Sequence, residues 1–571
     1  MTFHKFKSAI FTTVIVAITA LSAIAQTRTE FDRVQTFDAQ HYIIRVSFDA
    51  AKKKVFGDTT VVLKPLNTNF KTIELDAVDL DIDSVTIDPA GVALKFRTSN
   101  DKVIVTLDRA YSTDETIAIR LKYAANPKKG IYFIDAETAE KRVEHSNQIW
   151  TQGEPDEARH WFPSFDFPSD KATTEEYITA EKNETVIGNG ELIGKEPASN
   201  GKVTWHYKMS VPHSTYLVSF VIGEYARIDD KYKDIPLSFY TYPGKEQTAR
   251  TAFGSTKDMI AAFEKATGVA FPYNKYDQTV VAKFTYGGME NITATTMADS
   301  EIFFADFDFG KAVVDDLVSH ELAHSWFGDL VTCRNWAELW LNEGFATYME
   351  AVYLEQTQGR TAYLRKIQGD ADEFLADDAT TKRRHGLYNL RAQEVDKLFD
   401  VSAVTYSKGS VVIHMLREEV GTDVFWRAVN NYLNKHKFGN VGSIDLQTAM
   451  EKESGRDLGW FFDQWVYHSG APRLTITSNY SARTKLLKIT VNQTQKADAV
   501  VPAAFQLPIT FAIKTVNGTE AVTKNIQKRN ETYSIKLNSK PIGIGVSPTT
   551  YNPEDNVPAK TVKISPIVFG P

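Results

Sequence analysis

The chain has 571 residues, a formal net charge of −7, 43% hydrophobic residues and 24% charged residues. This mixture is typical of an ordinary folded protein, which excludes wholesale disorder, and the lack of a long basic run argues against nucleic acid as a partner. The single cysteine, Cys333, excludes an intramolecular disulfide framework and a zinc site with several thiolates, so any metal must be bound mainly by histidines and carboxylates.

Residues 1–25 have the pattern of a secretory signal peptide. Lys5 and Lys7 form a short positive region, residues 9–21 are mostly apolar, and Ala23-Ile24-Ala25 is a small-x-small cleavage signal. The apolar run is short for a spanning helix, although an uncleaved N-terminal anchor stays open as the alternative. We therefore expect export to the periplasm or the exterior, with no membrane span in the mature chain and membrane association only if the signal stays uncleaved.

Residues 26–233 carry a β pattern. Short runs of alternating apolar and polar residues, such as 42–48, 59–63 and 102–107, are separated by turn residues. Many short strands without a helical period predict a large sandwich or a saddle-shaped sheet.

From about Pro236 the apolar spacing becomes helical, and we expect an α-rich domain over residues 234–470. A short β-rich stretch at 279–283 interrupts it, and Gly328 and Gly421 stand where helices would stop. The predicted helices cover 249–267, 311–328, 337–358, 361–375, 407–420, 423–436, 445–454 and 458–467.

Alternating runs return after Ala471, at 474–477, 487–491 and 510–513. The remaining residues, 471–571, are enough for one small β-sandwich. The predicted fold class is therefore α+β and multidomain, with an N-terminal β domain, an α-rich central domain and a C-terminal β-sandwich.

A candidate metal site lies in the first long helical pattern of the central domain. In His320-Glu321-Leu322-Ala323-His324 the two histidines are four residues apart, so they project from one helical face and can bind one ion. A third protein ligand is needed before water takes the open position of a catalytic zinc site. Glu343, with 18 residues between it and His324, is the candidate, because a second helix can run back past the first. Glu321 then points toward the metal-bound water and acts as its general base.

Several separate blocks resemble the M1 family of zinc aminopeptidases, the aminopeptidase N group of gluzincins. The resemblance covers nearly the whole mature chain and implies a thermolysin-like zinc catalytic domain, one Zn2+ held by His320, His324 and Glu343, and peptide substrates with a free N-terminus. The matching blocks, in family order, are Thr151–Pro155, Phe162–Asp166, Gly287–Asn291, His320–Thr332, Trp340–Glu350, Tyr406–Gly409 and Phe461–Trp465.

The resemblance also implies how a substrate is held. Glu290 matches the family's amine-binding glutamate, and Glu154 with Gln152 matches a second pair that approaches from the N-terminal domain. The segment Gly287-Gly288-Met289 matches a strand that aligns the substrate main chain, and its glycines allow close backbone approach. The family usually has alanine at the position of Gly288.

Tyr406 matches the family's catalytic tyrosine, whose phenol stabilises a developing oxyanion. Asp329 and Glu338 are candidates for carboxylates that orient a histidine. The predicted activity is hydrolysis of the N-terminal peptide bond, with Glu321 as base and Tyr406 as oxyanion donor.

Three other functions are alternatives. A thermolysin-type endopeptidase commonly has an Asp four residues after the carboxylate ligand, where this chain has Thr347. The leukotriene hydrolase branch carries an acid and a tyrosine where this chain has Leu398 and Val401, so epoxide hydrolysis is not supported. A non-enzymatic peptide-binding protein would be free to lose a ligand, the base or the tyrosine, and all five are present.

Family members often continue into a large helical C-terminal domain, for which a chain that stops at residue 571 has no room. We therefore expect a short form with a more open site and weaker restriction on peptide length. Neither the oligomeric state nor the preferred N-terminal residue can be read from the sequence.

Overall fold

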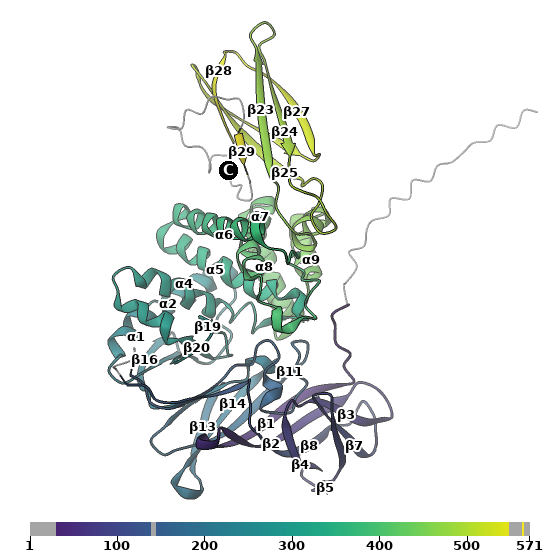
Figure 1. Ribbon diagram of the computed structural model, residues 1–571, viewed down its shortest axis with the longest axis vertical. Helices are drawn as coiled ribbons and strands as arrows, with labels where there is room; N and C mark the ends of the chain where they lie inside the picture. Colours follow the sequence, from purple (N-terminus) through teal and green to yellow (C-terminus); the bar gives the residue numbers. More distant parts are fainter. Residues whose placement is uncertain (1–29, 139–143, 547–561, 565–571) are drawn as a thin grey trace, which may run out of the picture.

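The computed structural model describes residues 30–138, 144–546 and 562–564. Its N-terminal part is rich in β-strands, its middle is mainly helical, and its C-terminal part is again β, as the sequence predicts (Figure 1). The predicted signal peptide lies outside the described residues. Nowhere in the part of the chain that is described is a helix both long and apolar enough to cross a membrane.

The N-terminal part is built on an eight-stranded sheet in which every pair is antiparallel except β1 with β11. In spatial order its strands are β13 (Glu191–Pro197), β14 (Val203–Ser214), β11 (Lys171–Ala180), β1 (Phe37–Asp49), β2 (Lys54–Pro65), β8 (Ile117–Ala125), β4 (Leu80–Ile87) and β5 (Val92–Ala93). In β1, β8 and β11 buried and less buried residues alternate, so one face of this sheet covers a core.

Two smaller sheets complete this part. One has the order β3 (Phe70–Asp76), β7 (Lys102–Tyr111) and β6 (Lys95–Ser99). The other has the order β12 (Thr185–Gly188), β15 (Phe220–Gly223), β10 (Gln148–Thr151) and β9 (Ile131–Ile134), and β10 leads directly into the predicted substrate-binding segment.

The central part begins with a mixed five-stranded sheet that positions the predicted substrate strand. Its order is β16 (Ala226–Tyr232), β17 (Ile235–Thr241), β18 (Tyr276–Val281), β20 (Ala294–Ala298) and β19 (Gly288–Met289). Because β19 is the last strand in this order, one of its edges pairs with β20 and the other faces away from the sheet. A two-stranded parallel pair, β21 (Val331–Cys333) with β22 (Gly439–Val441), follows later.

Helices cover the rest of the central part (Figure 1). They are α1 (Glu246–Phe253), α2 (Thr256–Thr267), α3 (Asp299–Ile302), α4 (Gly310–Ala323), α5 (Trp340–Gln358), α6 (Arg360–Thr380), α7 (Gly409–Val420), α8 (Thr422–His436), α9 (Ser443–Ser454) and α10 (Gly459–Phe462).

Several predicted helices differ from the observed ones, and the one expected over 458–467 is α10 followed by a π-helical turn, η9 (Asp463–Tyr467). The helix expected over 249–267 is divided into α1 and α2 at Gly254, a residue with low helix propensity. The helix expected over 311–328 ends at Ala323, because the chain turns at once and Asp329 N donates to His324 O at 3.0 Å. The helix expected over 407–420 is preceded by a π-helical turn, η8 (Val404–Lys408).

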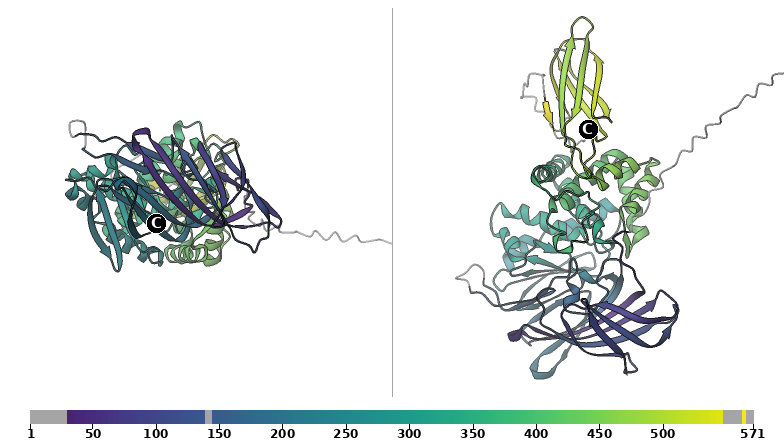
Figure 2. Two further views of the ribbon diagram at one scale, coloured as in Figure 1. Left: turned by 90° about the horizontal axis from the view of Figure 1, so that it is seen from below. Right: turned by 45° about the vertical axis from the view of Figure 1, so that its right-hand side comes forward.

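The C-terminal strands form two sheets at the end of the molecule opposite the N-terminal sheets, with the helices between them (Figure 2). One sheet has the order β27 (Asn530–Lys536), β24 (Leu486–Gln493), β23 (Leu474–Ser481) and β29 (Val562–Ile564). The other has the order β26 (Gly518–Ile526), β25 (Leu507–Thr515) and β28 (Pro541–Val546). The C-terminal strands therefore lie far from the predicted site.

Candidate active site

A cavity of about 330 Å³ lies where the helical part meets the N-terminal sheets, and every predicted catalytic, metal-binding and substrate-binding residue lines it. Four further lining residues were not predicted: Tyr286, Leu317, Glu350 and Phe399. The predicted residues in the cavity are Gln152, Glu154, Gly287, Gly288, Met289, Glu290, His320, Glu321, His324, Glu343 and Tyr406.

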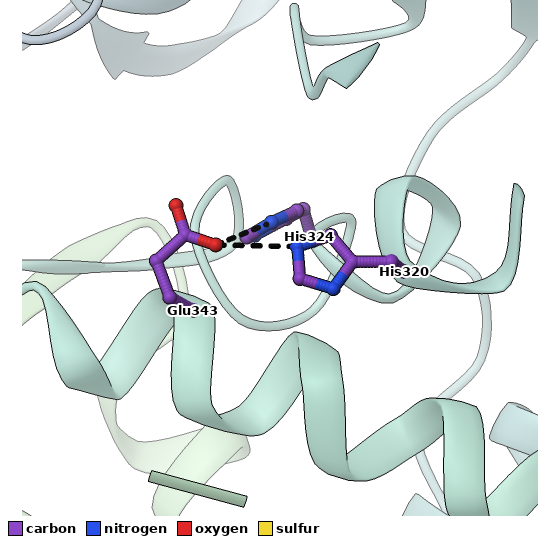
Figure 3. Close-up of side chains that lie close together, drawn as sticks. All are labelled: His320, His324 and Glu343. Atoms are coloured by element: carbon purple, nitrogen blue, oxygen red, sulfur yellow. Dashed lines mark hydrogen bonds and ion pairs between the residues drawn. The ribbon is translucent and has the colours of Figure 1, made fainter. Parts of the chain in front are cut away.

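Two histidines and one glutamate meet where α4 ends and α5 begins. The rings of His320 and His324 lie one helical turn apart, with centroids separated by 4.9 Å. Glu343 Oε2, from the first turn of α5, lies 3.2 Å from His320 Nε2 and 3.4 Å from His324 Nε2 (Figure 3). Ligands held tetrahedrally at ~2.0–2.1 Å from zinc stand ~3.3 Å apart, so these three donors fit Zn2+ in both chemistry and spacing.

His320 is oriented by a carboxylate that the sequence analysis missed. Its Nδ1 lies 2.8 Å from Glu350 Oε1, and Glu350 Oε2 pairs with Lys366 Nζ at 2.7 Å. Lys366 also pairs with Asp370 at 3.0 Å. A hydrogen bond at Nδ1 sets the ring so that Nε2 faces Glu343, as a metal-binding histidine requires. The spacing contains a signal for Glu350, since it follows Glu343 by seven residues, two helical turns along one face of α5.

His324 is oriented by the backbone instead. Its Nδ1 donates to the carbonyl oxygen of Phe327 at 2.9 Å, which again leaves Nε2 directed at Glu343. Of the two candidate carboxylates, Glu338 accepts a hydrogen bond from Ser443, and among the described contacts none joins the Asp329 side chain to either histidine ring by a hydrogen bond. The prediction for Glu338 is therefore wrong, because its side chain turns toward α9.

The electrostatics of the cluster favour a cation. Burial alone would lower the pKa of both histidines, but the carboxylates around them outweigh it, and the pKa of His320 rises to about 9 while that of His324 also rises. Burial likewise acts to raise the pKa of Glu343, yet His324 and His320 hold it at about 2. The buried cluster thus stabilises positive charge beside Glu343, and a divalent cation would provide it.

Glu321 points into the same cavity without joining the three candidate ligands. Its Oε2 lacks a hydrogen-bond partner among the described residues, and burial raises its pKa to about 8. A carboxyl group with a pKa near neutrality is suited to taking a proton and returning it. A Cβ at Gly288 would lie 2.3 Å from Glu321 Oε1, so the glycine lets β19 approach this carboxylate more closely than alanine would.

A group of polar side chains lies next to the histidines, at the end of the cavity formed with the N-terminal sheets. Glu154 and Gln152 follow β10, Glu290 follows β19, and all three are buried. Gln152 Nε2 donates to Met289 Sδ at 3.2 Å, whereas the Oε1 atoms of Gln152 and Glu154 have no partner within the described chain. Buried acceptors without donors are costly, so a ligand that donates hydrogen bonds would complete this end of the cavity.

The carboxylates at this end also repel one another. Burial raises the pKa of Glu154, and the neighbouring Glu290 raises it further. Burial raises the pKa of Glu290 as well, while His324 opposes the shift. Single oxygens of Glu154, Glu290 and Glu343 all lie within 4.8 Å of one another, close enough for one small cation to contact all three.

Tyr406 lies in the π-helical turn η8, a type of turn that is often found at functional sites. Its ring stacks beside His320, with centroids 5.8 Å apart and planes at 18°. Burial, followed by the charge of Glu343, raises the pKa of the phenol well above its ordinary value. The hydroxyl therefore stays protonated and can donate a hydrogen bond next to the candidate metal position.

Two models of one protein family match this chain. Residues 251–465 match the peptidase family M1 domain, and residues 38–217 match the peptidase M1 N-terminal domain. The chain belongs to peptidase family M1. The cavity of this M1 chain is lined by residues from both matched regions.

Relatives of this M1 chain are named as aminopeptidases. It is 28% identical over 538 residues to "Aminopeptidase 2, mitochondrial" of Saccharomyces cerevisiae, an alignment that covers 90% of this chain and 55% of the relative. It is 29% identical over 498 residues to "Probable aminopeptidase 1" of Sulfurisphaera tokodaii, covering 83% and 59%. It is 32% identical over 341 residues to "Aminopeptidase N" of Streptomyces lividans, covering 57% and 39%. The chain thus spans less than two thirds of the length of these relatives.

Proposed function

We propose that the protein is a zinc-dependent aminopeptidase that hydrolyses the N-terminal peptide bond of peptides. The observation that carries the proposal is the joining of two groups in one cavity: a His320, His324 and Glu343 donor set and, beside it, the buried oxygens of Glu154 and Glu290. The first group supports metal-assisted hydrolysis, and the second supports recognition of a free α-ammonium group.

His320, His324 and Glu343 would hold one Zn2+. When bound, zinc lowers the pKa of water and polarises a carbonyl group. Glu321 takes the proton of the attacking water and passes it to the leaving amine, which its raised pKa favours. Tyr406 donates a hydrogen bond to the oxyanion that develops on the scissile carbonyl.

Glu290 and Glu154 would anchor the substrate's α-ammonium group, with the amide oxygen of Gln152 as a third acceptor. A cation at this position relieves the repulsion between the carboxylates and supplies donors to oxygens that lack them. Because the anchor lies next to the candidate metal position, only the first peptide bond can reach the reacting groups. This arrangement distinguishes an aminopeptidase from an endopeptidase, whose substrates continue in both directions.

The backbone of Gly287, Gly288 and Met289 would align the substrate. Among the described strands β19 pairs only with β20, so its other edge is available to an extended peptide. The closeness of Gly288 to Glu321 supports this role, because a peptide bond aligned there lies beside the proposed base.

The experiment that tests the function compares two substrates on the purified protein. We expect release of nitroaniline from leucine p-nitroanilide and no release from its N-acetylated form, since acetylation removes the charge that Glu290 and Glu154 bind. Equal cleavage of free and acetylated substrates would contradict the aminopeptidase proposal. The Glu321→Gln variant, which should keep its fold, is the control for a contaminating peptidase.

We also propose that the chain is exported through the signal pattern at residues 1–25. We further propose three domains: a β saddle or sandwich over 26–233, a thermolysin-like domain over 234–470 and a small β-sandwich over 471–571. The β, helical and β succession of elements supports this division. N-terminal sequencing of the protein from its native host should begin at Gln26, and a sequence that begins at Met1 would contradict cleavage.

A further inference from the structure

A second cavity, of about 650 Å³, lies beside the candidate active site. The two cavities share one stretch of backbone: residues 282–285 line the second cavity, and residues 286–290 line the first. Thr285 lines the second cavity and Gly287 lines the first. These residues are two positions apart in the chain, so their Cα atoms are at most ~7 Å apart. A ligand that follows this backbone out of the first cavity therefore enters the second.

The order of groups along the backbone sets the direction in which a peptide would run. Glu290, the proposed amine anchor, stands at one end, and Gly288 meets the proposed base Glu321 two residues earlier. A peptide antiparallel to β19 has its N-terminus near Glu290 and its scissile bond near Gly288. The residues after the scissile bond then continue past Gly287 toward Thr285.

The second cavity is lined by aromatic rings that the protein leaves partly uncovered. Phe304 and Phe307 are 39% and 56% exposed, and their ring centroids lie 6.2 Å apart. Phe307 also stacks on Phe309, which is 70% exposed, at 5.7 Å. Contiguous exposed rings of this kind mark sites that apolar groups bind.

Both described lysines of the second cavity are paired with acids, and a third acid of its lining, Asp299, accepts a hydrogen bond from Tyr242 Oη at 3.2 Å. Lys283 Nζ contacts Glu137 Oε1 at 2.7 Å, and Lys245 Nζ contacts Asp306 Oδ2 at 2.9 Å. Because each of these lysines has an acidic partner, the described residues that line the cavity offer no unpaired lysine to an anionic ligand. The lining is mixed, with polar groups beside five apolar side chains, and an apolar side chain of a ligand would contact the apolar ones: Ala282, Phe284, Phe303, Phe304 and Phe307.

We propose that this second cavity binds the third to fifth residues beyond the scissile bond of a peptide substrate and prefers a bulky apolar side chain there. The proposal rests on the proposed function, because the direction of the peptide follows from the amine anchor. Residues 285–287 are bends, so the chain from Gly288 to Thr285 spans at most ~10 Å, and the third to fifth residues beyond the scissile bond, at ~3.3 Å per extended residue, cover that distance. Burial of a phenylalanine between Phe304 and Phe307 should lower KM about tenfold relative to glycine.

The test uses heptapeptides that begin with leucine and contain glycine elsewhere, with one phenylalanine moved from the third to the seventh position. We expect KM for leucine release to fall about tenfold when phenylalanine occupies positions four to six, and to stay unchanged at positions three and seven. In the double variant Phe304→Ser and Phe307→Ser this minimum should disappear, while hydrolysis of leucine p-nitroanilide continues at the wild-type rate. Phe56→Ser, which changes another exposed phenylalanine, is the matched control and should keep the minimum.

A binding measurement separates this proposal from the proposed function. The Glu321→Gln variant should bind the same fluorescently labelled peptides most tightly with phenylalanine at positions four to six, whether or not the wild type hydrolyses them. A flat series in binding and KM, or a minimum that survives in the double variant, would overturn the proposal. Recruitment of the wild type to anionic phospholipid vesicles, lost in the double variant and accompanied by a flat series, would overturn it in favour of a membrane surface.

A thiol label gives a second, independent test. Cys333 is buried, so Thr285→Cys introduces the one exposed thiol among the described residues. A bulky maleimide at that position should raise KM for the phenylalanine peptides and leave the anilide rate unchanged. Equal KM values before and after labelling would contradict the proposed path.

Discussion

At the metal end of the cavity His320, His324 and Glu343 all have partners within the protein. At the amine end Glu154 and Gln152 each carry an oxygen that has no hydrogen-bond partner among the described residues. Both ends are buried and rich in carboxylates, so burial does not distinguish them. The difference lies in charge balance. At the metal end, hydrogen bonds and ion pairs with Glu350 and Lys366 hold the histidine rings in place. At the amine end, the buried oxygens would gain hydrogen-bond donors from a bound ligand.

The largest expected effect comes from the group that lies between the two ends. Glu321→Gln should lower kcat for leucine p-nitroanilide by about 10²–10⁴-fold, because the amide cannot take the proton from water. Zinc content should stay at the wild-type level, since Glu321 is not one of the three candidate ligands. A variant that loses zinc along with activity would show that Glu321 belongs to the metal end instead.

The next largest expected effect is on substrate binding at the amine end of the cavity. Glu154→Gln should raise KM for leucine p-nitroanilide by roughly ten- to a hundredfold, since a hydrogen bond to a charged group contributes about 1.5–3 kcal/mol. kcat should change less than KM, and zinc content should not change. Glu157→Gln is the control: Glu157 is three residues away but accepts hydrogen bonds from Gly130 N and Tyr132 Oη, outside the cavity lining. Equal KM values for the two variants would remove Glu154 from the amine anchor.

At the metal end of the cavity, a substitution should change the affinity for zinc. Lys366→Met leaves Glu350 without its cation and weakens the hold of Glu350 on His320, so zinc affinity should fall about 10–100-fold. Competition with a fluorescent chelator measures this affinity. Lys257→Met removes an ion pair with Asp230 on the surface and should leave zinc affinity unchanged. If both variants bind zinc like the wild type, the Glu350 network does not orient the metal site.

Much of this contrast was predictable from the sequence, because the residues of each motif lie within a few turns of one another. The spacing of His320 and His324 defines a helical face, and the observed α4 carries it. Glu343 could be proposed because a return helix has a limited length. The roles of Glu154 and Glu290 were accessible only through family resemblance, since nothing in the spacing brings β10 and β19 into one cavity.

The rest depends on packing that no local pattern contains. Glu350 lies on the face of α5 that meets α4, but only the packing of the two helices shows that it reaches His320 Nδ1. Glu338 was only a candidate for orienting a histidine, and its side chain turns instead toward Ser443. The cavity lined by Phe304 and Phe307 arises where a turn before α4 meets the end of β18, and neither segment alone indicates it.

The smallest expected effect concerns a buried carboxylate outside the site. Burial raises the pKa of Glu176 to about 8, against 4.5 for an exposed group. Between these values the unfolded chain releases a proton that the folded chain keeps, so Glu176 reduces stability progressively as pH rises from about 4.5 to 8. Glu176→Gln should therefore melt at a higher temperature than the wild type at pH 9 and at the same temperature at pH 4, with kcat/KM unchanged. A difference in melting temperature that does not grow with pH would contradict this account.

The most direct test of the central claim is a titration of chelator-treated protein with Zn2+, with bound zinc and hydrolysis of leucine p-nitroanilide measured in the same samples. If His320, His324 and Glu343 form one metal site, activity should rise linearly and stop at one zinc per chain. In Glu343→Gln activity should stay near zero at that ratio. Full activity in metal-free protein, or an unchanged titration in Glu343→Gln, would contradict the claim.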